Sequence, residues 1–216
     1  MPVLDRIERL RCALSGPLPG SSVYRDVIPE GYDRETIAEG TPITSAAVLL
    51  ALHPDAAGER ILFPLIRRPD SMPQHAGQIA LPGGARDETE DAVTCALREA
   101  SEEIGLAAEE VEIIGKLTPV TIPVSRFRVD TVVGWTPAPP LLHPQESEVL
   151  AILFGDPDRL AREGPTTWVE RVRGGESMMF PAYSIQGEKV WGATALILAE
   201  FLAIWKQVLS VDSRHA

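Results

Sequence analysis

Three glutamates lie close together in the segment that ends at Gly105. Glu99, Glu102 and Glu103 occupy positions i, i+3 and i+4, which share one face of an α-helix. Carboxylates this close repel one another, and each like-charge pair weakens a helix by about 0.2–0.5 kcal/mol. Arg98 offsets this repulsion only in part. Because Mg²⁺ prefers carboxylate oxygens as protein ligands, the cluster indicates a site for a divalent metal ion.

A carboxylate-held metal ion suits the hydrolysis of a phosphate anhydride. It neutralises charge on phosphate oxygens, makes a bound water more acidic and orients the substrate. A glutamate that is not saturated by metal can accept the proton of that water. Upstream, Pro82, Gly83 and Gly84 let the backbone turn and approach a metal or phosphate without side chains in the way. On its own, however, a glutamate-rich helix face is more often a solvated surface.

The glutamates require a helix to position them, and the sequence predicts one over residues 91–104. Acidic residues stand at its start, where they suit the helix dipole, and Gly105 follows its end, where glycine is common. One apolar stripe at helical spacing consists of Val93, Ala96, Leu97, Ala100 and Ile104.

Strands are predicted on both sides of this helix. Apolar and β-branched runs bounded by turn residues predict strands over residues 45–53, 60–68, 111–121, 126–135, 148–154, 168–172 and 179–185, with a short extended piece at 78–81 and a loop at 82–84. Helical spacing predicts further helices near the N-terminus and over 157–162 and 193–209. This order predicts an α/β (α+β) fold with a mixed central sheet between helical layers. It disfavours a regular βαβ dinucleotide fold.

Composition narrows the class of protein. The chain has 216 residues, of which 44% are hydrophobic and 24% charged, and a net charge of −11. We expect a single domain over residues 1–216 with a helical extension over about 1–40. The acidic balance argues against binding of duplex nucleic acid. Cys12 and Cys95 form neither a disulfide framework nor a metal motif. With no apolar signal core and an apolar run near residues 193–205 that is interrupted by Glu200, we expect a cytoplasmic protein that does not bind a membrane.

Residues 84–106 resemble the Nudix box. That motif is glycine, five residues, glutamate, seven residues, Arg-Glu, an aliphatic residue, any residue, Glu-Glu, any residue, glycine and an aliphatic residue. Ala100 is smaller than the usual aliphatic residue at its place, and Leu106 fills the last aliphatic position. The fixed positions are filled by Gly84, Glu90, Arg98, Glu99, Glu102, Glu103 and Gly105. With the full box in register, a merely solvated helix face is a poor explanation.

The resemblance implies an α/β/α sandwich in which a loop–helix–loop binds Mg²⁺ or Mn²⁺. Glu99 and Glu103 would be the main ligands, joined by the backbone of Gly84. Glu102 would be a further ligand or the proton acceptor. Arg98 would hold the glutamates in place by ion pairing.

The segment before the box is similar to the signature of coenzyme A diphosphatase-like Nudix proteins. Arg68, Gly77 and Pro82-Gly83-Gly84 match it in register, and residues 191–195 (WGATA) resemble a later stretch of that group. Four positions depart from the signature: Ile66, Pro69, Pro73 and Leu81. The subgroup implies hydrolysis of coenzyme A or a derivative to 3′,5′-ADP and 4′-phosphopantetheine. A second hypothesis keeps the chemistry but changes the substrate to a dinucleotide, a nucleotide sugar or a nucleoside triphosphate.

Four residues upstream of the box are candidates for binding this small nucleotide substrate. Arg67 and Arg68 suit phosphate, because arginine binds it in a forked geometry, although they equally suit solubilising charges at a strand end. His75 and Gln78 are further candidates, with hydrogen-bonded turn residues as the alternative. Outside the box, Glu148 is a candidate base or a partner in a salt bridge. A non-catalytic nucleotide sensor is a third hypothesis, and a homodimer is left open.

Overall fold

The computed structural model describes residues 2–32, 37–38, 40–70, 77–173 and 175–210. The α-helices are α1 (Val3–Leu14), α2 (Ala92–Ile104), α3 (Pro157–Glu163) and α4 (Gly192–Ser210), and two 3₁₀ helices are η1 (Gly20–Asp26) and η2 (Ala108–Glu110). The strands are β1 (Thr44–Pro54), β2 (Ile61–Arg67), β3 (Ile79–Ala80), β4 (Gly83–Ala85), β5 (Glu112–Lys116), β6 (Val120–Ile122), β7 (Phe127–Trp135), β8 (Ala151–Gly155), β9 (Thr167–Arg173), β10 (Glu176–Ile185) and β11 (Glu188–Val190).

The main sheet is mixed and divided. Its strands run in the order β3-β2-β1-β7-β5, with β4 beside β1, β6 beside β7 and β8 beside β2. β1 is parallel to β7 and antiparallel to β2, which it meets at His53 and Pro54. Towards its start, β1 pairs instead with β4. β1 and β2 therefore diverge, and the backbone around Gly83 and Gly84 lies where they separate.

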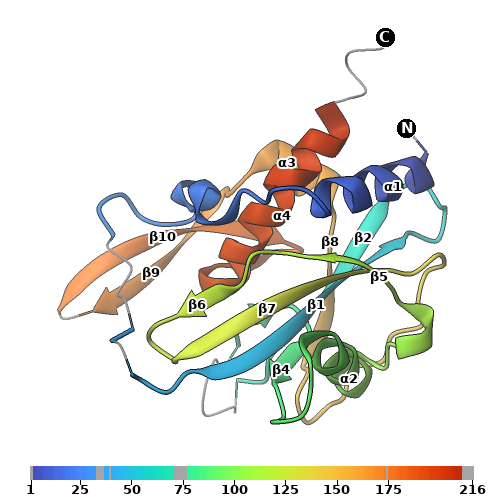
Figure 1. The fold of residues 1–216 in the computed structure, drawn as a ribbon. Coiled ribbons are helices and arrows are strands. Elements are labelled where there is room, and N and C mark those ends of the chain that lie inside the picture. The colour runs from blue at the N-terminus through green and yellow to red at the C-terminus, as the bar shows by residue number, and fades with distance from the viewer. Residues whose placement is uncertain (1, 33–36, 39, 71–76, 174, 211–216) are drawn as a thin grey trace.

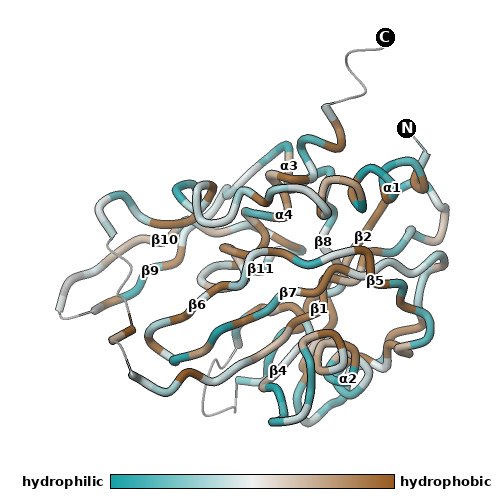
Figure 2. Tube along the Cα trace, in the orientation of Figure 1, coloured by the Kyte–Doolittle hydropathy of each residue, from teal (hydrophilic) through white to brown (hydrophobic). Residues whose placement is uncertain are grey.

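Helices cover both faces of this sheet, as the sequence predicted. Figure 1 shows α2 on one side and α1, α3 and α4 on the other. β9, β10 and β11 form a second antiparallel sheet of three strands. The apolar residues on the two faces of the main sheet form separate cores, a large one under α4 and a smaller one under α2. Figure 2 shows the hydrophobic residues of β1 and β2 between these helical layers.

Most predicted elements are present, with shifted boundaries. The loop predicted at residues 82–84 contains β4, because Gly83 and Gly84 pair with β1. The strand predicted at 111–121 is broken into β5 and β6, with Pro119, which has no N–H to donate to a ladder, in the break. The strand predicted from residue 148 begins at Ala151, since Glu148 lies in a turn and donates its N–H to the Gln145 carbonyl. β11 was not predicted.

Helix α4 is the central helix of the larger core. It has 19 residues and a hydropathy of 1.4, so its length and composition alone would allow it to cross a membrane, but 67% of its 18-residue apolar stretch is buried inside the fold. Its one acidic residue, Glu200, is fully buried. The Glu200 carboxylate accepts hydrogen bonds from the Gly20 N–H (2.8 Å), the Thr118 N–H (3.0 Å) and the Thr118 hydroxyl (2.6 Å). Glu200 thereby fastens the N-terminal segment and the chain before β6 to α4.

Replacing Glu200 by Ala should destabilise the protein by about 2–4 kcal/mol, because buried donors left without an acceptor each cost about 1–3 kcal/mol. Chemical denaturation measures this loss. Lys206→Ala is the control, since Lys206 lies on the exposed side of the same helix and its loss should change the free energy of unfolding by less than about 0.5 kcal/mol. Equal stability of Glu200→Ala and Lys206→Ala would contradict this account.

Candidate active site

Helix α2 is held closely against the sheet by small side chains. Ala92, Ala96 and Ala100 are buried on its inner face and pack in the core with β1. Asp91 caps the helix, with its carboxylate accepting the Thr94 N–H at 2.8 Å. The Ala100 position, where the box usually has a larger aliphatic residue, is fully buried, so the small side chain brings this helix close to the sheet.

Two glycines let the backbone before the box pack closely against its neighbours, which are Glu99 and strand β1. A Cβ on Gly84 would lie 2.5 Å from the Glu99 carboxyl carbon, and one on Gly83 would lie 2.3 Å from the Ala47 carbonyl oxygen. Gly83 also has a φ of 155°. These clearances leave no room for a side chain, so glycine at both positions is a packing requirement of the site.

Glu103 is the most buried of the glutamates. Its side chain is 1% exposed, and its Oε2 accepts the Gly83 N–H at 2.9 Å. Its Oε1 lies 3.6 Å from an Arg68 guanidinium nitrogen. Burial raises the pKa of Glu103 to about 7, the Gly83 hydrogen bond and Arg68 oppose this rise, and the negative charges of Glu99 and Glu148 add to it. The surrounding groups therefore stabilise this carboxylate incompletely.

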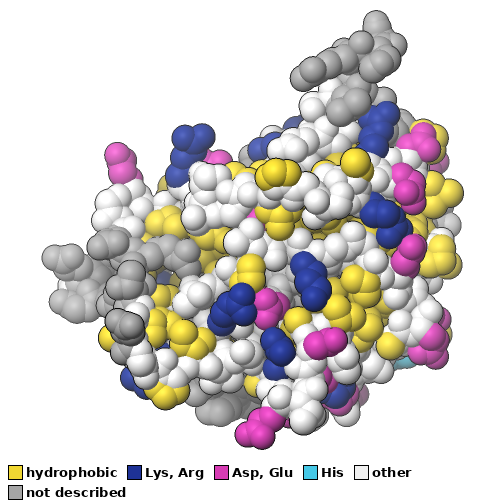
Figure 3. Space-filling model, viewed as in Figure 1, with side chains coloured by type: hydrophobic (Ala, Val, Ile, Leu, Met, Phe, Trp, Pro, Cys, Tyr) yellow, Lys and Arg dark blue, Asp and Glu magenta, His cyan; other side chains and the backbone are white. Residues whose placement is uncertain are grey.

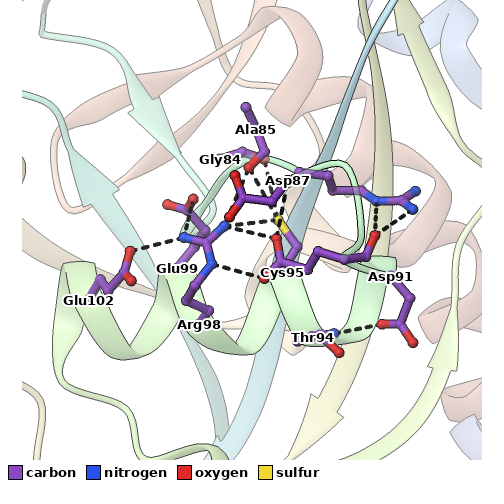
Figure 4. Close-up of polar contacts among 11 residues, drawn as sticks. Gly84, Ala85, Asp87, Asp91, Thr94, Cys95, Arg98, Glu99 and Glu102 are labelled. Atoms are coloured by element: carbon purple, nitrogen blue, oxygen red, sulfur yellow. Dashed lines mark hydrogen bonds and ion pairs between the residues drawn. The ribbon is translucent and has the colours of Figure 1, made fainter.

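Arg98 connects three glutamates of the segment. It donates to both Glu90 oxygens (2.9 and 3.0 Å), to Glu99 Oε1 (2.8 Å) and to Glu102 Oε2 (3.0 Å). Figure 4 shows its guanidinium in the centre of these contacts. The Arg98 hydrogen bond lowers the pKa of Glu90, whereas burial raises the pKa of Glu99 in spite of Arg98.

The predicted cluster is only partly assembled. Glu99 and Glu103 both face the Gly83–Gly84 backbone, but Glu102 is 59% exposed and paired with Arg98. Within the described ranges, no three His, Cys, Asp or Glu side chains are gathered closely enough to hold a metal ion. Burial, with a smaller contribution from neighbouring negative charges, raises the pKa of both inner carboxylates. A divalent cation would fit here, because such an ion would neutralise them and prefers their oxygens. Glu99, Glu103 and the Gly84 carbonyl are the groups that could hold it.

The substrate-binding candidates separate into different environments. Arg68 points to Glu103, and its N–H donates to the Gln78 carbonyl at 3.0 Å. Arg67 instead pairs with Glu188 (3.2 Å) and Asp70 (3.6 Å). Arg68 and Gln78 therefore lie beside each other near the glutamates, while Arg67 is bound in ion pairs on the side of β11. His75 lies outside the described residues.

Sequence reasoning missed Arg86, which holds the loop before α2. Its Nε and one terminal nitrogen donate to the Glu90 carbonyl (3.1 and 2.8 Å), and its other terminal nitrogen lies 3.4 Å from Asp130 on β7. Arg86 thus connects the loop to the sheet. The motif gives no signal for this role, because Arg86 occupies one of its unspecified positions.

The stability of the metal-free protein should depend on Glu103. The pKa of Glu103 in the folded protein is about 7, above its ordinary value. Its contribution to the free energy of unfolding is therefore fully present below about pH 4.5 and is lost as the pH rises through 7. In a chelator, Glu103→Gln should therefore become more stable relative to wild type by roughly 2–4 kcal/mol between pH 4.5 and 8. Urea unfolding across this range measures the difference. The exposed Glu109→Gln should show a flat difference, and a flat result for Glu103→Gln would contradict the assignment.

Comparison with known proteins identifies the group to which this arrangement belongs. A family model described as the NUDIX domain matches residues 44–172. An uncharacterized Nudix hydrolase NudL of Cronobacter sakazakii is 37% identical over 154 residues, covering 65% of this chain and 78% of the relative. The NudL of Pectobacterium atrosepticum is 38% identical over 138 residues, covering 62% and 70%.

A solved structure supports the fold. The MutT/nudix family protein from Enterococcus faecalis matches with a TM-score of 0.51 and 18% identity, covering 82% of this chain and 70% of that one. Its mixed α/β architecture is that described above. The family model and the relatives together show that the chain belongs to the Nudix hydrolase family.

Proposed function

We propose that this protein is a Mg²⁺- or Mn²⁺-dependent pyrophosphohydrolase that cleaves coenzyme A or a derivative into 3′,5′-ADP and 4′-phosphopantetheine. One observation carries the catalytic part of the proposal. The carboxylates of Glu99 and Glu103 meet the backbone of Gly83 and Gly84, with the Arg68 guanidinium beside Glu103. The partial match of residues 67–84 to the coenzyme A diphosphatase signature supports the substrate.

Different residues of this chain would bind the metal ion and the substrate phosphate. Glu99, Glu103 and the Gly84 carbonyl would hold the metal ion, which supplies charge neutralisation of the phosphate oxygens and a more acidic water. Arg68 lies beside the same place, and among the described residues its buried Nε has no hydrogen-bond partner. Its guanidinium therefore has donors left for a phosphate oxygen. Arg67, bound to Glu188 and Asp70, is the poorer phosphate ligand of the two.

Two glutamates compete for the role of proton acceptor. The Oε2 of Glu102 accepts a hydrogen bond from Arg98 at 3.0 Å, which leaves its Oε1 to accept a proton. Glu148 is exposed, and its negative charge adds, after burial, to the rise in the pKa of both Glu99 and Glu103. We propose Glu148 as the proton acceptor, because a base must lie close to the water that it activates.

A hydrolysis panel tests the proposal. With Mg²⁺ or Mn²⁺, the protein should release 3′,5′-ADP from coenzyme A, and a chelator should abolish this activity. Glu103→Gln should lower kcat/KM by at least about 100-fold, because even supporting residues of a metal site are worth 10–100-fold. Product identification by chromatography with mass spectrometry measures the outcome. The exposed Glu109→Gln is the matched control and should retain full activity.

The panel also separates the alternatives. Faster metal-dependent cleavage of a dinucleotide, nucleotide sugar or nucleoside triphosphate would reject coenzyme A and retain the chemistry. This hypothesis is favoured by Pro69, which stands where the signature has a small residue. Tight nucleotide binding without hydrolysis of any compound would reject the enzyme and favour a sensor.

Removing the Arg86 contacts with the Glu90 carbonyl and Asp130 should lower kcat/KM strongly and the melting temperature only slightly. Arg86→Ala should reduce kcat/KM by about 10–100-fold, because the loop that carries Gly84 and Glu90 would lose its support. Arg86→Lys should recover only part of the rate, since an ammonium cannot reproduce the forked contact with the Glu90 carbonyl and Asp130. Steady-state kinetics and thermal melting measure both effects. Arg60→Ala, which breaks an exposed pair with Asp55, should leave kcat/KM unchanged; an equal effect of both alanine variants would contradict the role.

A further inference from the structure

An apolar pocket lies apart from the carboxylates, at the start of α4. It is formed by four segments that are distant in the sequence: the chain after η1, the β6–β7 turn, β10 and the first turns of α4. Figure 3 shows hydrophobic side chains exposed in the left half of that view, between β6 and the β9–β10 hairpin. The residues that line the pocket are Val27, Ile28, Tyr32, Ile122, Pro123, Val124, Phe180, Gly192, Ala193 and Leu196.

The lining determines the chemistry of the occupant. No charged side chain belongs to it, and the Tyr32 hydroxyl is its only polar side-chain group among the described residues. Tyr32 packs edge-on against Phe180, with ring centroids 5.2 Å apart, and Phe180 packs against Trp191 at 5.8 Å. A phosphate or a nucleobase needs several hydrogen-bonding partners when it is buried. The pocket instead suits an uncharged aliphatic or aromatic group.

The volume limits the size of that group. The pocket is partly open to solvent, and the space within it measures about 130 Å³, close to the roughly 150 Å³ of an enclosed apolar cavity that binds benzene. An occupant of about five to seven carbon atoms is therefore expected from this comparison.

The wall of the pocket is joined to the catalytic loop. Ala193 lines the pocket, and the next residue, Thr194, donates its buried hydroxyl to the Ile79 carbonyl at 3.2 Å. Ile79 begins β3, and four residues later Gly83 donates its N–H to Glu103. Four extended residues span at most about 14 Å. The pocket wall is thus connected to the proposed site of cleavage through Thr194 and one short extended segment.

We propose that this pocket is a binding subsite for a small uncharged apolar group of five to seven carbons. The group can belong to the far end of the substrate or to a separate small molecule. The binding itself does not depend on the proposed reaction, whereas the distinction between these two sources does.

Titration with 1-hexanol and toluene, followed by the methyl NMR signals of the protein without nucleotide, tests the subsite. The signals of Val27, Ile122 and Leu196 should shift, with saturation. Ala193→Leu should fill the pocket and weaken binding more than about tenfold, since each methylene-sized group excluded is worth about fourfold. Val124→Asp places a charge at the rim and should weaken binding at least fourfold.

Val172→Asp is the matched control, because Val172 is as exposed as Val124 (70% and 71%) and does not line the pocket. It should bind the probes within twofold of wild type. Val124 is a surface residue, so this variant keeps the test decisive should Ala193→Leu fail to fold. Absence of saturable shifts in wild type, or equal binding by Val124→Asp and Val172→Asp, would overturn the subsite.

Kinetics with the best substrate of the panel then distinguish the two sources. If the substrate's own apolar end occupies the pocket, 1-hexanol should raise KM without changing kcat, and Val124→Asp should raise KM for that substrate. If a separate molecule occupies it, KM should stay unchanged or kcat should change. Both outcomes support the subsite once binding is shown. An inactive protein that still binds the probes would reject the proposed function and leave the subsite standing.

Discussion

This site depends on one electrostatic constraint. Glutamate carboxylates are packed between helix α2 and the main sheet, and the neighbouring arginines supply too little positive charge to balance them. Glu103 is buried, and its stabilising partners are one backbone N–H and a guanidinium at 3.6 Å. Glu99 shares Arg98 with Glu90 and Glu102, so one cation serves three carboxylates. Such a site is costly to the folded protein by itself. A bound cation would offset this cost, and metal binding would then raise the stability of the folded protein.

The divided sheet makes this crowding possible. β1 pairs with β2 at His53 and Pro54, at the end of the strand, and with β4 near its start. The Gly83–Gly84 backbone therefore enters between the two halves of the sheet. Glycine at position 84 leaves room for the Glu99 carboxylate, and glycine at position 83 leaves room for strand β1 while its N–H donates to Glu103. Arg86 then connects the loop beyond Gly84 to β7 through Asp130. The positions of the glutamates therefore depend on strand pairing and on the Arg86 contacts as much as on helix α2.

Sequence reasoning succeeded where local pattern determines structure. The helix predicted over residues 91–104 and its end at Gly105 follow from spacing and residue type, and the structure has α2 at Ala92–Ile104 with Gly105 after it. Spacing alone does not determine which partner each side chain takes. Glu102 shares a helix face with Glu99 and Glu103, yet it points to solvent because Arg98 lies four residues before it and takes its carboxylate. Arg67 and Arg68 are adjacent in the sequence but meet different elements, Glu188 of β11 and Glu103 of α2. No periodicity encodes those contacts.

The segments outside the box bear on which substrate is accepted. Glutamates on a helix can serve cleavage of any diphosphate, because they contact only the metal and the anhydride. Discrimination requires contacts with the rest of the molecule, and here those contacts can come only from groups around the box. Glu200 fastens the N-terminal segment to α4, and this attachment places the chain of Val27–Ile28 over the first turns of α4, where Gly192 and Ala193 complete an apolar wall. Thr194 joins that wall to β3. The N-terminal segment is thus an integral part of the fold, and it forms one side of the pocket although it contains no residue of the box.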